Sequence, residues 1–98
     1  MEIIKNRVDN NLDLALIGRL DTTPAPELEA VVKENVEGVT ALTLDFAKLE
    51  YISSAGLRIL LASQKIMNKQ GTMVIRNVNA DIMEVFEITG FSDILTVE

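Results

Sequence analysis

The fold is decided by residues 51–61, which read Tyr51-Ile52-Ser53-Ser54-Ala55-Gly56-Leu57-Arg58-Ile59-Leu60-Leu61. A strand-like apolar run ends at Ile52, and four small residues follow at 53–56. From there the spacing of the leucines changes to that of a helix with one apolar face. The stretch therefore predicts a strand that passes through a tight connection directly into an amphipathic helix, which is typical of α/β proteins.

Two serines stand at the predicted start of this helix. Ser53 is expected to be the N-cap, whose side chain accepts a hydrogen bond from an amide of the first turn. The first amides of a helix lack partners within the helix and carry the positive end of its dipole, so they also favour a phosphate on a neighbouring hydroxyl such as that of Ser54. Neither GxxxxGK[ST] nor GxGxxG occurs in the sequence. We therefore expect no nucleotide-binding loop and no cofactor.

The residues before this stretch predict a hairpin and a helix. Residues 2–8 and 12–18 read as two short strands, and Asp9-Asn10-Asn11 supplies a turn between them, so the strands should pair as a hairpin. Next, Thr23 is expected to cap a helix that has Pro24 in its first turn. This helix should run to about Glu37 and end at Gly38.

The remaining elements alternate between strand and helix. Residues 42–46 and 72–76 read as strands, and the helix that begins after Ser53 should end before Gly71. Asn79 is expected to cap a third helix over about 80–88, and residues 94–97 read as a last strand. The predicted order is β-β-α-β-α-β-α-β in one domain spanning 1–98, with a small mixed β-sheet flanked by helices. The predicted fold class is thus α/β.

Composition excludes several functions. The 98 residues are 48% hydrophobic, enough for one core, and they include no Cys and no His. Ser-His-Asp and Cys-His nucleophiles are therefore excluded, and only carboxylates remain as metal ligands. Nothing in the sequence groups other ligands with Asp21 or Asp45, so we expect no metal site, no catalytic residue and no enzyme activity.

Charge and hydropathy bear on partners and location. The net charge of −6 opposes binding to nucleic acid. The apolar runs are too short to span a bilayer, and the absence of cysteine suits a reducing compartment, so we expect a cytoplasmic protein without direct membrane insertion. No carboxylate occurs between Tyr51 and Ala80, where Arg58, Lys65, Lys69 and Arg76 lie. The two lysines suit a helix C-terminus, whereas Arg58 is not explained in this way.

At this point the chain resembles the anti-sigma factor antagonists of the STAS superfamily. Gly18-Arg19-Leu20-Asp21 looks like that family's Gly-x-Leu-Asp. Residues 44–46 together with 51–57 resemble its strand, turn and Asp-Ser-Ser/Thr-Gly-Leu signature. Residues 85–91, Val85-Phe86-Glu87-Ile88-Thr89-Gly90-Phe91, resemble its late phenylalanine and glycine element. In this chain Ser53 takes the place of the signature aspartate and Ala55 that of Ser or Thr, so Ser53 stays open as a rival acceptor.

The resemblance implies a function and a site. An unphosphorylated protein of this kind binds an anti-sigma factor, usually a serine kinase, and frees a sigma factor; phosphorylation at Ser54 ends the binding, and a serine phosphatase restores it. The residues expected to meet the partner are Asp21, Thr22, Ser53, Ala55, Gly56, Leu57 and Arg58. Two alternatives remain open, namely an accessory subunit of a membrane-lipid transport ATPase, which needs no phosphorylation, and a ligand-binding domain.

Overall fold

The computed structural model describes residues 1–98 and contains one mixed sheet with helices on it. The sheet has the order β1-β2-β3-β4, in which β1 and β2 are antiparallel and the other neighbours are parallel. The strands are β1 (Glu2–Val8), β2 (Asn11–Leu20), β3 (Ala41–Ile52) and β4 (Thr72–Arg76). The helices are α1 (Ala25–Asn35), α2 (Ser54–Asn68) and α3 (Ala80–Thr89), followed by a 3-10 turn, η1 (Phe91–Asp93). The predicted α/β class and mixed sheet are confirmed.

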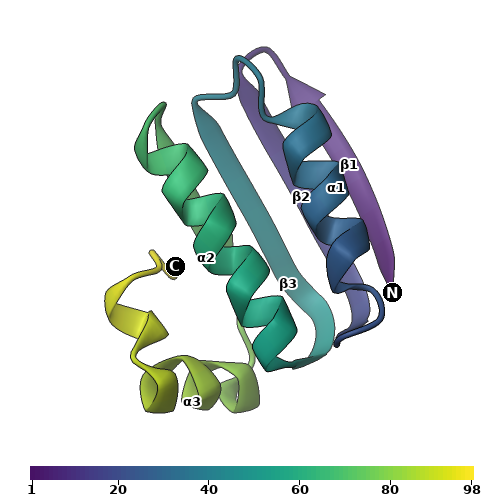
Figure 1. The fold of residues 1–98 in the computed structure, drawn as a ribbon, viewed down its shortest axis with the longest axis vertical. Coiled ribbons are helices and arrows are strands. Elements are labelled where there is room, and N and C mark those ends of the chain that lie inside the picture. Colours follow the sequence, from purple (N-terminus) through teal and green to yellow (C-terminus); the bar gives the residue numbers. More distant parts are fainter.

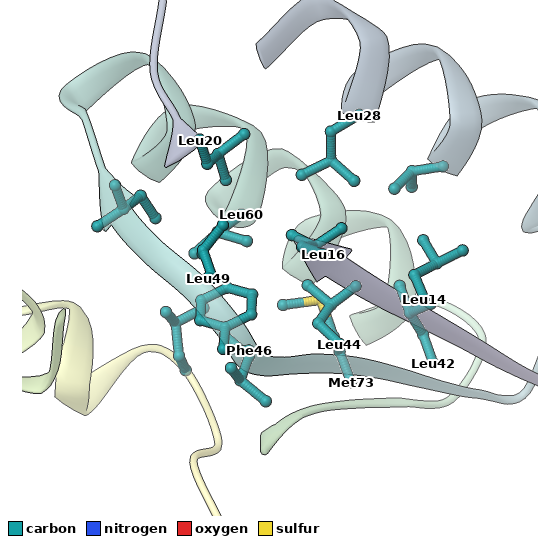
Figure 2. Packing of buried hydrophobic residues seen from close by; sticks show 14 of the residues in the cluster. Leu14, Leu16, Leu20, Leu28, Leu42, Leu44, Phe46, Leu49, Leu60 and Met73 are labelled. Atoms are coloured by element: carbon teal, nitrogen blue, oxygen red, sulfur yellow. The ribbon is translucent and has the colours of Figure 1, made fainter. Parts of the chain in front are cut away.

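One face of the sheet forms the core. Figure 1 shows α1 and α2 side by side on the same face of β1–β3, while α3 lies across one end. Alternate residues of β2 and β3 point toward the helices and are fully buried, as period-2 alternation requires. Figure 2 shows these leucines meeting Phe46, Leu60 and Met73 in a single cluster. Met67 and Met73 also fill the core, since their exposure is 0% and 1%.

Strand β3 is much longer than the predicted 42–46. The reason is a register shift between Ala15 and Ile17 of β2, opposite Asp45 and Lys48 of β3. The Asp45 carboxylate accepts a hydrogen bond from the amide of Ala47 at 2.9 Å, which holds this irregularity. A bulge changes which residues face inward, so the alternation breaks in the sequence although the pairing continues.

Helix α1 differs from the prediction at both ends. Pro24, and not Thr23, occupies the N-cap position, and no side chain caps the helix. The helix ends at Asn35 instead of Glu37. There the Arg7 guanidinium donates to the Asn35 carbonyl at 3.2 Å and so satisfies one of the helix's last carbonyls. This partner comes from β1, which local sequence cannot reveal.

The predicted strand over residues 94–97 is wrong as a full strand. Only Val97 forms an isolated bridge, parallel to Ile75. Upstream, Ile94 has helical backbone angles at the end of η1, and the Leu95 amide donates to the Phe91 carbonyl at 2.8 Å. Residues 91–95 therefore form a local turn, and the chain reaches β4 too late to pair with it along a full strand.

The predicted caps of the other two helices are confirmed. The Ser53 side chain accepts from the Gly56 amide at the start of α2, and the Asn79 side chain accepts from the Ile82 amide at 2.8 Å at the start of α3. Gly90 ends α3 in the left-handed conformation at φ 81°. Both predictions succeeded because capping is a local interaction.

Candidate functional site

The residues singled out from the sequence lie where β2 and β3 end. These strands are parallel, and Leu20 of β2 is in register with Ile52 of β3. The loop that leads to α1 and the start of α2 therefore leave the sheet at the same edge, as Figure 1 shows at its lower end. The main-chain nitrogen of Ser53 donates to the Leu20 carbonyl at 2.9 Å and links the two connections.

The two serines at the start of α2 are in different states. The Ser53 hydroxyl accepts from the Gly56 amide at 3.3 Å, and the residue is half-buried. Ser54 is the first residue of α2, is exposed, and its hydroxyl makes no hydrogen bond within the chain. The Ser54 hydroxyl is therefore the free one of the two.

A third serine on the same helix is not accessible. Ser63 is 2% exposed, and its hydroxyl donates to the Ile59 carbonyl at 2.8 Å. Because the Ser63 hydroxyl is buried and already hydrogen-bonded, it is not accessible, whereas the Ser54 hydroxyl is.

Gly56 and Leu57 lie inside the molecule and do not form part of its surface. A Cβ at residue 56 would lie 2.8 Å from Leu20 Cγ and 3.0 Å from the Leu20 carbonyl oxygen. Leu57 is 6% exposed and belongs to the core cluster. Of the residues expected to meet a partner, Gly56 instead allows the start of α2 to approach the end of β2, and Leu57 packs in the core.

A shallow hollow of about 340 Å³ lies between the first turns of α1 and α2. Three of the expected contact residues border it, namely Thr22, Ala55 and Arg58. Glu29 of α1 also borders it, so its rim carries both signs of charge. The remaining lining residues are Ala25, Pro26 and Ile59.

Asp21 directly follows β2 in the loop that leads to α1. It is half-buried, and its carbonyl accepts from the Ala25 amide at 3.1 Å. Its carboxylate lies 4.0 Å from Arg19 Nε, and the Arg19 guanidinium lies 4.3 Å from the centre of the Tyr51 ring. Sequence reasoning missed Arg19 and Tyr51 as part of this edge, because only the strand register places them opposite each other.

Asp45 belongs to the sheet and not to this site. It accepts hydrogen bonds from Asn77 Nδ2 at 3.0 Å and from the Ala47 amide, and these bonds lower the pKa of its carboxyl. No group of three or more acidic side chains that could hold a metal ion occurs in the structure. None of the helices has the length and apolar character needed to cross a membrane.

Comparison with known proteins identifies the class. The profile of the STAS domain matches residues 2–98, so the chain belongs to the STAS-domain family. Two relatives are more specific. BtrV of Bordetella bronchiseptica, which carries the provisional name of an anti-sigma factor antagonist, is 36% identical over 99% of this chain and 85% of its own length. An anti-sigma-B factor antagonist of Staphylococcus epidermidis is 31% identical over 91% of this chain and 84% of its own. These relatives assign the chain to the anti-sigma factor antagonists within that family.

Solved structures agree on the fold. The Bacillus protein SpoIIAA superposes in its unphosphorylated form with a TM-score of 0.80 at 18% identity, covering 99% of this chain and 87% of SpoIIAA. Its phosphorylated form superposes with a TM-score of 0.78 at 17% identity, covering 99% and 91%.

Proposed function

We propose that this protein binds an anti-sigma factor through the edge formed by the β2–α1 loop and the first turn of α2, and that phosphorylation of Ser54 ends the binding. The bound anti-sigma factor releases its sigma factor, so the unmodified protein favours transcription. The protein would act in the cytoplasm, where RNA polymerase works. Membership of the anti-sigma factor antagonists supports the first half of this proposal.

One observation carries the second half. Ser54 is the exposed serine at the start of α2, whereas the Ser53 hydroxyl caps the helix and the Ser63 hydroxyl is buried. A kinase must reach the hydroxyl that it modifies, and Ser54 is reachable without opening the helix. The resemblance to the family's signature supports the same residue. SpoIIAA, which shares the fold, is known in a phosphorylated form.

A phosphate at this position suits folding but opposes docking. It adds about −1.5 to −2 charges next to the free amides and the positive end of α2, where negative charge is tolerated. Burying the same charge against a partner costs desolvation and adds repulsion with any acidic or phosphate group there. The modification is therefore expected to weaken the complex without unfolding the domain.

The partners follow from this scheme. The anti-sigma factor itself, as a serine kinase, would phosphorylate Ser54, and a serine phosphatase would regenerate the binding form. The protein supplies a hydroxyl and a docking surface but performs no catalysis. Its own site therefore requires neither a cofactor nor a metal.

The test uses the purified chain with its cognate anti-sigma factor kinase and ATP. Site-localised mass spectrometry should find phosphate on Ser54 alone, and Ser54→Ala should accept none. The matched control Ser53→Ala should still be phosphorylated at Ser54, since only the cap is removed. Stoichiometric phosphorylation of Ser54→Ala would disprove the assignment. Calorimetry of the unmodified chain with the anti-sigma factor tests binding separately, and no measurable affinity would disprove the antagonist role.

A further inference from the structure

Strand β1 forms a free edge of the sheet, which the proposed function does not use. The sheet order gives β1 a neighbour on one side only, and Figure 1 shows it as the outermost strand beside β2. All of its seven residues are exposed except Ile3, which is half-buried. An exposed edge strand of this length is a template for pairing with another chain.

Alternate main-chain groups of β1 point outward from this edge. The Ala41 amide donates to the Asn10 carbonyl at 3.3 Å, so that carbonyl faces β3. Alternation along β2 turns the main-chain groups of Asn11 the other way, toward Val8 of β1, with which Asn11 is in register. Even-numbered residues of β1 therefore bond to β2, and odd-numbered residues direct their N–H and C=O groups away from the sheet. The odd-numbered residues are Ile3, Lys5 and Arg7.

The charges of β1 favour one register for antiparallel pairing with a second copy of the same strand. Two registers would oppose Lys5 either to its own copy or to Arg7 of the second copy. Like charges directly opposite each other are destabilising. A register that is symmetric about Ile4 avoids both contacts and pairs residues 1–7 in full. It also brings the outward N–H and C=O groups of the two strands together.

Ile4 lies at the centre of this register. It is in register with Ala15, which alternates with the buried Leu14 and Leu16, so its side chain lies on the face of the sheet opposite the helices. That side chain is 50% exposed. Because the main-chain groups of Ile4 bond to β2, the two isoleucines would form a non-hydrogen-bonded pair, in which side chains approach most closely. Pairing therefore removes apolar surface of both side chains from water.

The helix-covered face offers complementary charges. The Arg7 guanidinium donates to the Asn35 carbonyl at the end of α1 but takes no part in any of the ion pairs of the structure. At the start of α1, Glu27 is exposed and also takes no part in those ion pairs. Glu27 borders the same hollow as Met1. Since Arg7 of the second copy lies opposite Met1 in this register, its guanidinium comes within reach of Glu27.

We propose that the chain forms a symmetric dimer in which β1 pairs antiparallel with β1 of a second copy and joins the two sheets into one. Ile4 meets its own copy at the centre, and Arg7 of each copy pairs with Glu27 of the other. The dimer does not require phosphorylation, because Ser54 begins α2 and lies outside this interface.

Sedimentation of the purified wild-type chain over a range of concentrations tests the association and should show a reversible monomer–dimer equilibrium. Hydrogen exchange followed by NMR locates the contact. In the dimer the outward amides of Ile3, Lys5 and Arg7 should exchange more slowly, whereas those of Ile4 and Asn6 already bond to β2 and should not change. A chain that stays monomeric at every concentration, or added protection confined to other segments, would overturn the proposal.

Variants test the two side-chain contacts, and an NMR spectrum of each verifies that it is folded. Ile4→Lys opposes two like charges at the centre and should weaken the dimer at least about fivefold. Ile88→Lys is the matched control, because Ile88 is 77% exposed on α3, and it should leave the association unchanged. A folded Ile4→Lys that dimerises as strongly as wild type would exclude β1 as the interface.

A charge reversal tests the ion pair. Arg7→Glu and Glu27→Arg should each weaken the dimer, and the combined variant should recover most of the lost affinity, because the pair forms again with its charges exchanged. A combined variant that associates no more tightly than either single variant would show that Arg7 does not pair with Glu27.

Discussion

The main-chain nitrogen of Ser53 donates to the main-chain oxygen of Leu20 across 2.9 Å, and this bond joins the end of β2 to the start of α2. It is continuous with the parallel pairing of Leu20 and Ile52. The bond fixes the exposed Ser54 hydroxyl beside the loop that contains Asp21 and Thr22. The start of α2 and that loop thus form one surface.

Replacement of Ser54 by Asp should weaken binding to the anti-sigma factor at least about tenfold, or roughly 1.4 kcal/mol. The added charge must be desolvated in the interface, as a phosphate would be. Folding should be unaffected, because an acid is favourable at a helix N-terminus. Ser54→Asn is the uncharged control of similar size and should bind better than Ser54→Asp. Equal affinity of Ser54→Asp and wild type by calorimetry would contradict the switch.

Loss of the cap should destabilise the fold without removing the phosphate acceptor. Ser53→Ala deletes the hydroxyl that accepts from the Gly56 amide, and such losses cost about 0.5–2 kcal/mol. Ser53→Asp restores a capping oxygen and should recover most of this stability. Urea unfolding measures both variants. A Ser53→Ala protein as stable as wild type would show that the 3.3 Å bond contributes little.

Gly56→Ala should be destabilising although alanine favours helices. The gain in helix propensity is about 1 kcal/mol, whereas the new methyl would overlap Leu20 and Ile52 side chains at 2.8 and 2.9 Å. Overpacking of this kind costs about 1–3 kcal/mol, so we expect a net loss of up to about 2 kcal/mol. Ser54→Ala is the control on the same turn, because residue 54 is exposed. If urea unfolding shows Gly56→Ala to be more stable than wild type, α2 can shift relative to β2 and make room for the new methyl group.

Arg58 should strengthen the effect of the phosphate. It lies four residues after Ser54 and is exposed on α2, a spacing that brings two side chains together on one helical face. Phosphate on Ser54 would draw in the guanidinium and remove it from contact with the partner. An exposed pair contributes only about 0.2–1 kcal/mol, so burial of the phosphate must account for most of the switch.

Four proteins test this contribution: wild type and Arg58→Ala, each with and without phosphate. Phosphorylation should weaken partner binding by a larger factor in wild type than in Arg58→Ala. If calorimetry gives the same factor for both pairs, Arg58 takes no part in the switch.

The ionised Asp45 carboxylate should stabilise the fold near neutral pH, and this contribution to the free energy of unfolding should be lost in acid. Hydrogen bonds from Asn77 and from the Ala47 amide lower the pKa of the folded carboxyl below 3.8. A carboxyl whose pKa is lower in the folded state stabilises the protein above its unfolded pKa, and this contribution is lost as pH falls through the folded pKa. The difference in unfolding free energy between wild type and Asp45→Asn should therefore be constant near pH 7 and shrink below about pH 4. A difference that does not change with pH would rule out the ionised carboxylate as its cause.

Residues 51–61 show how far local pattern carries a prediction. The change of period from strand to helix and the capping serine were predictable, because both depend on neighbours within four residues. The same holds for Asn79 and α3. The C-terminal end of α1 was not predictable, because it depends on Arg7 from a distant strand. The length of β3 was not predictable either, because a bulge interrupts the alternation of its residues.

The sequence by itself determined the α/β class, the order of the elements down to α3, the family resemblance and the position of Ser54, since these follow from local periodicity, capping and motif order. Only the tertiary structure decided which serine is free, that Gly56 and Leu57 are buried, and that Arg19 stacks on Tyr51. It also decided that Val97 merely touches β4. The physical reason is that exposure, strand register and close approach are set by residues far apart in the chain, and their positions exist only once the sheet and helices have packed.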